Sequence, residues 1–317
     1  MMAMSAHEAA SAPEERIVRM RPGRALVAMA RPSQVALVWA VYAAGVLLGL
    51  ARTGAAAEPW PVLMGALLIG GAAVSAHLVN EAEDAQTDRL TVRTPFSGGS
   101  GALAASGLAA SVPLRVGLVL AAVVVAAIWL AWVELGLPAL AATLMLAGLA
   151  GALCYSLPPL AAMRHGWGEP LNALLGALLL PLAGVAAVVG SVGLADLLAF
   201  LPLTLVTFAS VMATAWPDRE ADAASGKLTL QVRLQPWALR RVHAAASVAA
   251  VAAMGLAALA GASPFALAGL LIVPALVVGI LHYTRQTSPL PNVAAMVGLT
   301  LVLLLANGTG LVSGWGI

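Results

Sequence analysis

Charge is scarce in this chain, and cysteine is almost absent. Only 9% of the 317 residues are charged, whereas 61% are hydrophobic, and the mean hydropathy is +0.95. Soluble domains carry roughly a quarter of charged residues, so this composition excludes a soluble globular protein and indicates an integral membrane protein. The single cysteine, Cys154, excludes an intramolecular disulfide.

Long apolar runs occupy most of the chain after residue 32. A membrane-spanning helix needs about 20 apolar residues. Nine runs of this kind lie near 33–51, 60–79, 113–133, 137–156, 169–190, 195–215, 240–260, 264–283 and 290–312. Because the runs are continuous and rich in Ala and Leu, they exclude a barrel of short alternating strands. We therefore predict an all-α bundle of about nine transmembrane helices around a central cavity, formed by one domain over residues 33–317.

The basic residues predict the orientation of the bundle. Residues 1–32 contain five arginines and no clean apolar core, so we expect a disordered cytoplasmic tail and not a signal peptide. With the N-terminus inside, 15 of the 16 basic residues lie on the inner side, and only Arg52 lies outside. The positive-inside rule then predicts a cytoplasmic N-terminus in the inner membrane.

Half of the acidic residues fall in two short windows. Of the 14 acidic residues, the first window holds Glu81, Glu83, Asp84 and Asp88, and the second holds Asp218, Glu220 and Asp222. The windows follow the second and sixth apolar runs, so both are expected at the cytoplasmic end of the bundle. Two long polar loops there, about 80–112 and 216–239, are where the chemistry is expected.

The two windows share one spacing. Asn80, Asp84 and Asp88 stand at i, i+4 and i+8, which places them on one face of a helix. The second window repeats this with Thr214, Asp218 and Asp222. Glu83 and Glu220 fall off these faces and are expected to be solvated.

Carboxylates that converge in this way require a cation. Two of them about 6 Å apart repel by roughly 3 kcal/mol at an effective dielectric constant near 20. A few hard oxygen ligands that leave room for water suit Mg²⁺ bound together with a substrate's phosphates. We therefore predict a magnesium and diphosphate site at the cytoplasmic surface, with Asn80, Asp84, Asp88, Asp218 and Asp222 as the metal ligands.

These motifs resemble those of a known family. The pair N-x-x-x-D-x-x-x-D and D-x-x-x-D is similar to the motifs of the UbiA-type intramembrane prenyltransferases. The likeness extends over residues 33–312 and includes the segments 94–100, 155–160, 166–169 and 226–234. It is closest to the branch that prenylates dihydroxynaphthoate in menaquinone biosynthesis. The resemblance implies Mg-dependent transfer of a polyprenyl group from an allylic diphosphate to an aromatic acceptor, with membrane lipid around the protein and no nucleic-acid partner.

Further residues are assigned roles in substrate binding. Arg93, in a Gly-rich loop, and Lys227, the only lysine, can supply positive charge to a diphosphate. Tyr155 and Arg164, at the inner end of the fourth span, are candidates for the substrate pocket. Asn80 and Thr214 are expected to contact the substrate beside the aspartates. Asp84, Asp88, Asp218, Asp222 and Lys227 are the expected catalytic residues.

The chain departs from the menaquinone branch at several positions, and these departures keep alternatives open. Ala82 and Glu83 stand where relatives usually carry aromatic residues, Thr214 replaces an Asn, and Gln235 replaces a Gly. A terpene cyclase on the same scaffold would ionise the same substrate without an acceptor. A cation transporter would require charges near the membrane midplane, and a CDP-alcohol phosphotransferase would require a single D-x-x-D-G-x-x-A-R stretch, which does not occur here.

Overall fold

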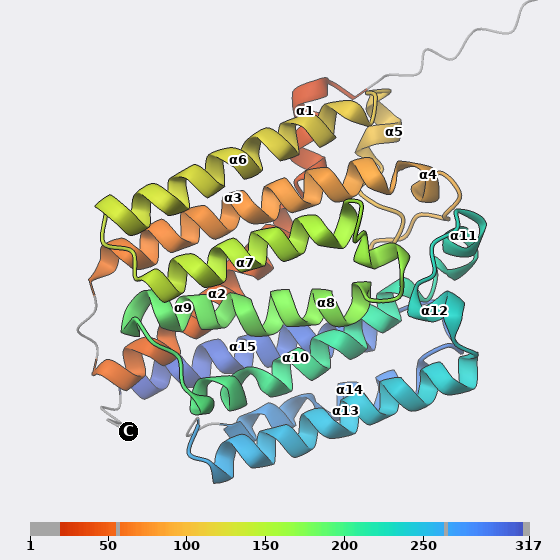
Figure 1. The fold of residues 1–317 in the computed structure, drawn as a ribbon. Coiled ribbons are helices and arrows are strands. Elements are labelled where there is room, and N and C mark those ends of the chain that lie inside the picture. Colours follow the sequence, from red (N-terminus) through yellow and green to blue (C-terminus); the bar gives the residue numbers. More distant parts are fainter. Residues whose placement is uncertain (1–19, 55–57, 263–265, 313–317) are drawn as a thin grey trace, which may run out of the picture.

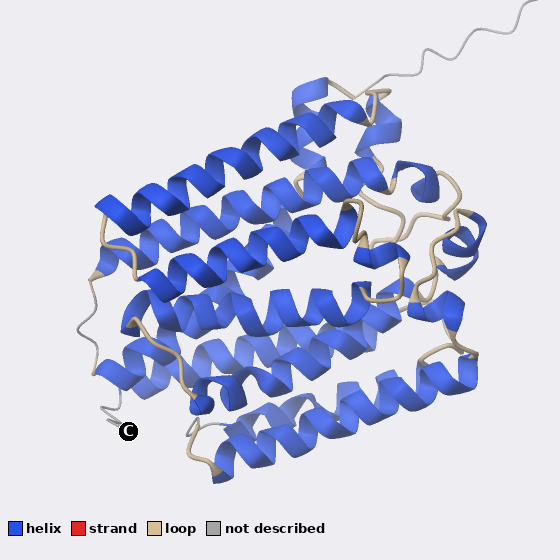
Figure 2. Ribbon diagram, viewed as in Figure 1, coloured by secondary structure: helices blue, strands red, loops and turns tan. Residues whose placement is uncertain are grey.

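The computed structural model describes residues 20–54, 58–262 and 266–312. Within these ranges the chain forms helices and connecting loops, with no strand, and the long helices run side by side in one bundle (Figure 2). The predicted all-α class is confirmed. Arg16 and Arg19 of the expected tail lie outside the described residues.

Among the described residues, eight helical segments are long and apolar enough to cross a membrane. They comprise α2 (Pro32–Thr53), α3 (Pro59–Glu83), α6 (Ser111–Glu134), α7 (Ala139–Ser156), α8 to α9 (Gly168–Val189), α10 (Leu194–Ala215), α13 (Pro236–Leu259) and α15 (Leu290–Val312). The segment from α8 (Gly168–Leu174) to α9 (Leu180–Val189) contains a π-helical turn at Leu175–Leu179. The span expected over 264–283 differs from the others. It begins as a 3₁₀ helix, η3 (Ala266–Ile272), and continues as the short α14 (Val273–His282).

Part of the N-terminal segment is folded, which corrects the expectation of a disordered tail through residue 32. Helix α1 (Pro22–Met29) packs on α5 (Ala102–Ser106), with Ala25 and Met29 fully buried. Arg31 has a left-handed backbone with φ of 52° and joins α1 to α2. This segment is therefore part of the folded bundle.

Helices α2 and α9 lie at the centre and are shared by two hydrophobic cores. Their backbones approach closely at glycines. A Cβ atom added to Gly45 would lie 1.8 Å from the carbonyl oxygen of Pro181, and one on Gly184 would lie 2.5 Å from that of Tyr42. Small residues at such crossings permit the close packing on which helix association in membranes depends.

The two ends of the bundle differ in chemistry. Short helices α4 (Ala85–Asp88), α11 (Arg219–Ala224) and α12 (Leu230–Arg233) gather with their loops at one end, and the C-terminal end of α15 lies at the other (Figure 1). At that other end Arg52 Nη1 pairs with the buried Asp196 at 2.6 Å. We call the end that carries α4, α11 and α12 the polar end.

Candidate active site

The two aspartate windows form turns with the same backbone. α3 ends before Asp84, which has φ of −88° and ψ of −1°, and the short α4 follows. α10 ends shortly before Asp218, which has φ of −85° and ψ of −3°, and the short α11 follows. In each turn the second aspartate donates its N–H to the carbonyl oxygen of the first, at 2.9 Å from Asp88 to Asp84 and 2.8 Å from Asp222 to Asp218. We call these the first and second aspartate turns.

The side chains of the first turn follow the predicted spacing. Asn80 Nδ2 donates to Asp84 Oδ2 at 2.9 Å and lies 3.4 Å from Ser156 Oγ at the end of α7. Asp88 lies against the Gly-rich loop, where a Cβ atom on Gly99 would stand 2.0 Å from Asp88 Oδ2. A glycine is therefore required here, both for this approach and for its φ of +64°.

The second turn is arranged differently. Thr214 Oγ1 donates to the carbonyl oxygen of Val211 at 3.0 Å, within its own helix, and the structure gives it no bond to Asp218. Within the described part of the chain, Asp218 Oδ1 is buried without a hydrogen-bond partner. Asp222 Oδ2 accepts from Thr229 Oγ1 at 3.3 Å. The shared i, i+4 spacing thus joins the polar side chain to the aspartate only in the first turn.

Lys227 brings the two turns together. Its Nζ lies 2.5 Å from Asp84 Oδ1 and 3.8 Å from Asp222 Oδ1, so one ammonium contacts a carboxylate of each turn. Thr87 Oγ1 also donates to Ser225 Oγ at 3.1 Å, which joins the two turns a second time. The expectation that both windows lie at the same end of the bundle is confirmed.

Burial and mutual repulsion perturb these carboxyls. Burial, reinforced by Asp84 and Glu81, raises the pKa of Asp88 to about 7. Burial and the neighbouring Asp222 raise the pKa of Asp218 to about 6. Burial also raises the pKa of Asp222, and the ammonium of Lys227 opposes that change. The site therefore carries more negative charge than its single ammonium can balance.

No ready metal cage is present in the part of the chain that the structure describes. No three His, Cys, Asp or Glu side chains stand close enough together there to hold a metal ion. The four aspartates are gathered at one end, but Lys227 stands between the two turns.

The remaining predicted residues surround the turns without bonding to the aspartates. Arg164 Nη2 donates to the carbonyl oxygen of Glu83 at 3.1 Å at the end of α3. Arg93 is exposed, and its guanidinium lies across Gly101. Tyr155 packs against Gly168, where a Cβ atom would lie 3.2 Å from Tyr155 Cε2. Glu220 is exposed, as expected.

Glu81 supports the first turn and was not assigned a role from the sequence. It is 2% exposed, accepts from Arg31 Nη2 at 3.0 Å and binds both the backbone N–H and the hydroxyl of Ser100. Because Arg31 is 50 residues away in sequence, no local pattern could have indicated this pair. Glu81 thereby anchors the Gly-rich loop that packs on Asp88.

Gln231 supports the second turn and was also missed. Its side-chain Nε2 donates to the backbone carbonyl oxygen of Met212 at 2.8 Å, and its backbone carbonyl oxygen accepts from Arg219 Nε at 2.8 Å. Tyr283, stacked on the buried His243 with ring centroids 4.5 Å apart, lies beside it. The polar groups that hold the second turn thus extend toward α13 and α14.

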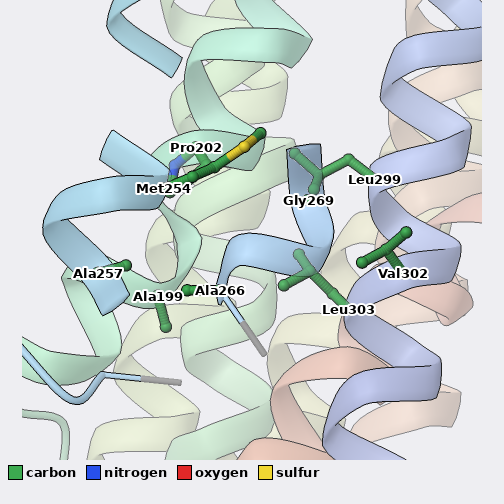
Figure 3. Close-up of a pocket in the computed structure, with 9 residues that line it drawn as sticks. All are labelled: Ala199, Pro202, Met254, Ala257, Ala266, Gly269, Leu299, Val302 and Leu303. Atoms are coloured by element: carbon green, nitrogen blue, oxygen red, sulfur yellow. The ribbon is translucent and has the colours of Figure 1, made fainter. Parts of the chain in front are cut away.

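A small apolar cavity lies away from the aspartates. It is enclosed by α10, η3, α13 and α15 and lined by residues such as Pro202, Met254, Gly269 and Leu303 (Figure 3). Pro202 precedes Asp218 by 16 residues in sequence, which corresponds to about 24 Å along a helix. The cavity lining has no group suited to a diphosphate, so this cavity does not belong to the candidate site.

Comparisons with known proteins agree with the architecture. The model of the UbiA prenyltransferase family matches residues 37–304. The structure of a UbiA homologue from Archaeoglobus fulgidus bound to DMAPP and Mg²⁺ is 19% identical, with a TM-score of 0.66 over 91% of this chain and 99% of that one. The structure with GPP and Mg²⁺ is 17% identical, with a TM-score of 0.65 and the same coverage.

A third solved structure, that of a digeranylgeranylglyceryl phosphate synthase, is 14% identical, with a TM-score of 0.62 over 93% of this chain and 100% of that one. At these identities the likeness is one of fold. Among curated proteins, none matches this chain.

Proposed function

Because the chain belongs to the UbiA prenyltransferase family, we propose that it transfers a polyprenyl group from an allylic diphosphate to an aromatic acceptor in quinone biosynthesis. The observation that carries the proposal is the meeting of the two aspartate turns at Lys227. A diphosphate at this point would lie at the polar end, with its prenyl tail directed among the apolar spans. The menaquinone branch remains part of this proposal and rests on the motif resemblance.

The donor atoms of the two turns suit a Mg²⁺ ion in their chemistry, although the carboxylates of the described residues would have to move closer together to hold it. Among the described residues, Asp218 has a buried oxygen without a hydrogen-bond partner, and two of the four aspartates, Asp84 and Asp222, contact one ammonium. The negative charge of these carboxylates exceeds the positive charge of the ammonium. Carboxylate oxygens are also the ligands that Mg²⁺ prefers. Asp84, Asp88, Asp218 and Asp222, with the amide of Asn80, would hold the ion, which when bound would supply positive charge to a departing diphosphate.

The chain's own groups would divide the rest of the work. Lys227 would donate to the diphosphate oxygens as the allylic C–O bond breaks and its electron pair passes to the leaving group. Arg93 would add positive charge from the Gly-rich loop, and Asn80 holds Asp84 in orientation at 2.9 Å. The apolar spans would keep water from the allylic cation. The acceptor ring carbon then forms the new bond, and the ring loses a proton or carbon dioxide.

The proposed reaction takes place at the cytoplasmic face of the inner membrane. This orientation rests on the positive-inside rule. Cysteine labelling in a Cys154→Ala background tests it. Val92→Cys, at an 87% exposed position of the polar end, should react from the cytoplasm, and Glu134→Cys, at the other end, only from outside. The reverse pattern would contradict the orientation.

The proposed activity is tested with purified protein, Mg²⁺ and a labelled allylic diphosphate, with and without dihydroxynaphthoate. We expect a prenylated acceptor, and product formation that is slower by about 10²-fold or more in an Asp84→Asn variant. Cyclic or hydrolysed product formed without acceptor would instead favour a terpene cyclase. Absence of any diphosphate release would contradict the proposal. A cation transporter is disfavoured because the described aspartates of both turns gather at one end of the bundle, away from its middle.

A further inference from the structure

Lys227 lies between carboxylates of the two aspartate turns. It is 5% exposed, and its Nζ contacts Asp84 Oδ1 at 2.5 Å and Asp222 Oδ1 at 3.8 Å. These oxygens belong to different turns, so the ammonium joins the turns as a shared cation would. It is also the only lysine in the chain.

The backbone holds Lys227 in this position. Its N–H donates to the carbonyl oxygen of Asp222 at 2.9 Å, directly after Gly226, which has φ of +76°. The next residue, Leu228, donates its N–H to the carbonyl oxygen of Arg164 at 2.9 Å. The side chain itself remains a long, flexible stem with one charged end. The ammonium can therefore move while its backbone stays fixed.

An ammonium and a divalent cation cannot use the same carboxylate oxygens at once. Lys227 must leave Asp84 and Asp222 before Mg²⁺ can coordinate both, and it leaves readily only if another anion accepts it. A diphosphate is such an anion, because its oxygens accept hydrogen bonds from an ammonium. The two ligands would then assist each other's binding.

We propose that Lys227 is a tethered counter-ion that weakens the binding of Mg²⁺ alone and yields readily to Mg²⁺ when a diphosphate arrives to receive its ammonium. This inference rests on the proposed function for the identity of the ligands. It predicts that Mg²⁺ binds weakly to the free protein and that diphosphate strengthens that binding. By linkage, Mg²⁺ strengthens diphosphate binding by the same factor.

The first test measures Mg²⁺ binding without turnover, by thermal unfolding of the detergent-solubilised, metal-free protein with inorganic pyrophosphate as the probe. Lys227→Met should raise the Mg²⁺ affinity in the absence of pyrophosphate by about ten-fold or more. Pyrophosphate should then increase the Mg²⁺ affinity of this variant by a smaller factor than it does in the wild type. Lys227→Arg keeps the competing charge and should stay near the wild type. An unchanged or weakened Mg²⁺ affinity in Lys227→Met would overturn the proposal.

Arg233→Met is the matched control. Arg233 lies in the same loop region, and its Nη1 donates to the carbonyl oxygen of His165 at 2.9 Å and not to an aspartate. This variant removes one positive charge from the polar end and should change the Mg²⁺ affinity by no more than about two-fold. An increase equal to that of Lys227→Met would show a general charge effect and would contradict a specific counter-ion.

A second measurement needs no variant and so does not depend on folding of Lys227→Met. Lys227 has the only ε-amine in the chain, so acylation of its peptide by an amine-reactive reagent reports on it alone. Saturating Mg²⁺ should release the ammonium and increase acylation, and added pyrophosphate should protect it again. Acylation that Mg²⁺ leaves unchanged would overturn the proposal. Neither measurement uses an acceptor or a prenyl group. A failure of the counter-ion proposal can therefore be distinguished from a failure of the proposed prenyl transfer.

Discussion

The two aspartate turns have one backbone and two sets of supports. Both place an aspartate with nearly identical φ and ψ between a long and a short helix. In the first turn an amide from Asn80 orients Asp84, whereas in the second the hydroxyl of Thr214 bonds to its own helix and Asp218 keeps a buried oxygen free. The comparison teaches that equal spacing fixes the path of the chain, while the neighbouring side chains determine how each carboxylate is held.

The largest expected effect on turnover comes from removing the charge of the first aspartate in either turn. Asp84→Asn or Asp218→Asn should each lower kcat by about 10²-fold or more, since metal-mediated charge stabilisation is worth several kcal/mol. Steady-state turnover at saturating Mg²⁺ measures this. If only one of the two variants lost activity, the turns would not be equivalent in function.

Glu220→Gln is the control for that experiment. Glu220 is exposed and lies between Asp218 and Asp222 in sequence, so its substitution should leave turnover nearly unchanged. Retention of more than about a tenth of wild-type turnover by Asp84→Asn would show that Asp84 is not a primary ligand.

Removal of the ammonium of Lys227, which joins the two turns, should lower kcat as much as the aspartate substitutions do, or somewhat less. Lys227→Ala should lower kcat by about 10²-fold with a smaller change in KM, because its charge matters most as the diphosphate departs. Lys227→Arg should recover only part of the rate, because a planar guanidinium does not replace a compact ammonium. An Arg variant with unchanged kcat would exclude a specific role for the lysine in catalysis.

The raised carboxyl pKa values predict a pH dependence shared by the turns. With pKa values of about 7 for Asp88 and about 6 for Asp218 in the metal-free site, both are largely protonated at pH 5 and ionised at pH 8. Mg²⁺ requires the ionised form, so its affinity should rise by about ten-fold or more between pH 6 and pH 8.

The stability of the metal-free protein should fall as the pH rises, in contrast to the Mg²⁺ affinity. A carboxyl with a raised folded-state pKa binds more protons folded than unfolded, so stability falls as pH rises from the ordinary value of 3.8 toward about 7. Thermal unfolding of the metal-free protein at pH 5 and pH 8 measures this. Addition of Mg²⁺ should restore stability mainly at pH 8, and an equal gain at both pH values would contradict the role of these carboxyls.

The smallest expected effect comes from making the second turn resemble the first. Thr214→Asn would offer an amide four residues before Asp218 and should lower the pKa of Asp218 and raise the Mg²⁺ affinity by about three-fold. Asn80→Thr, the reverse change in the first turn, should weaken Mg²⁺ binding by a similar factor. Isothermal titration of both variants with Mg²⁺ and pyrophosphate compares them. If Thr214→Asn weakened Mg²⁺ binding, threonine would be the better residue at this position of the second turn.

The sequence allowed the spans and the meeting of the two windows to be predicted, because apolar runs and the placement of charge are local signals. It also allowed the Asn80 to Asp84 contact to be predicted, since that pair lies one helical turn apart. The partners of Glu81 and Gln231 could not be predicted, since Arg31 and Met212 reach them only through the packing of helices that are distant in sequence. The contact of Lys227 with Asp84 spans 143 residues and depends on the same packing.

The 3₁₀ helix η3 affects how many times the chain can cross the bilayer. Seven 3₁₀ residues at about 2.0 Å each and ten α residues at about 1.5 Å each reach about 29 Å, close to the thickness of the hydrocarbon core. The same 17 residues as one α-helix would reach only about 26 Å. The stretched geometry thus gives this segment, which is shorter than the eight spans found among the described residues, a length close to the thickness of the bilayer core. Because the segment returns the chain to the polar end, α15 ends at the end of the bundle opposite to the aspartate turns (Figure 1).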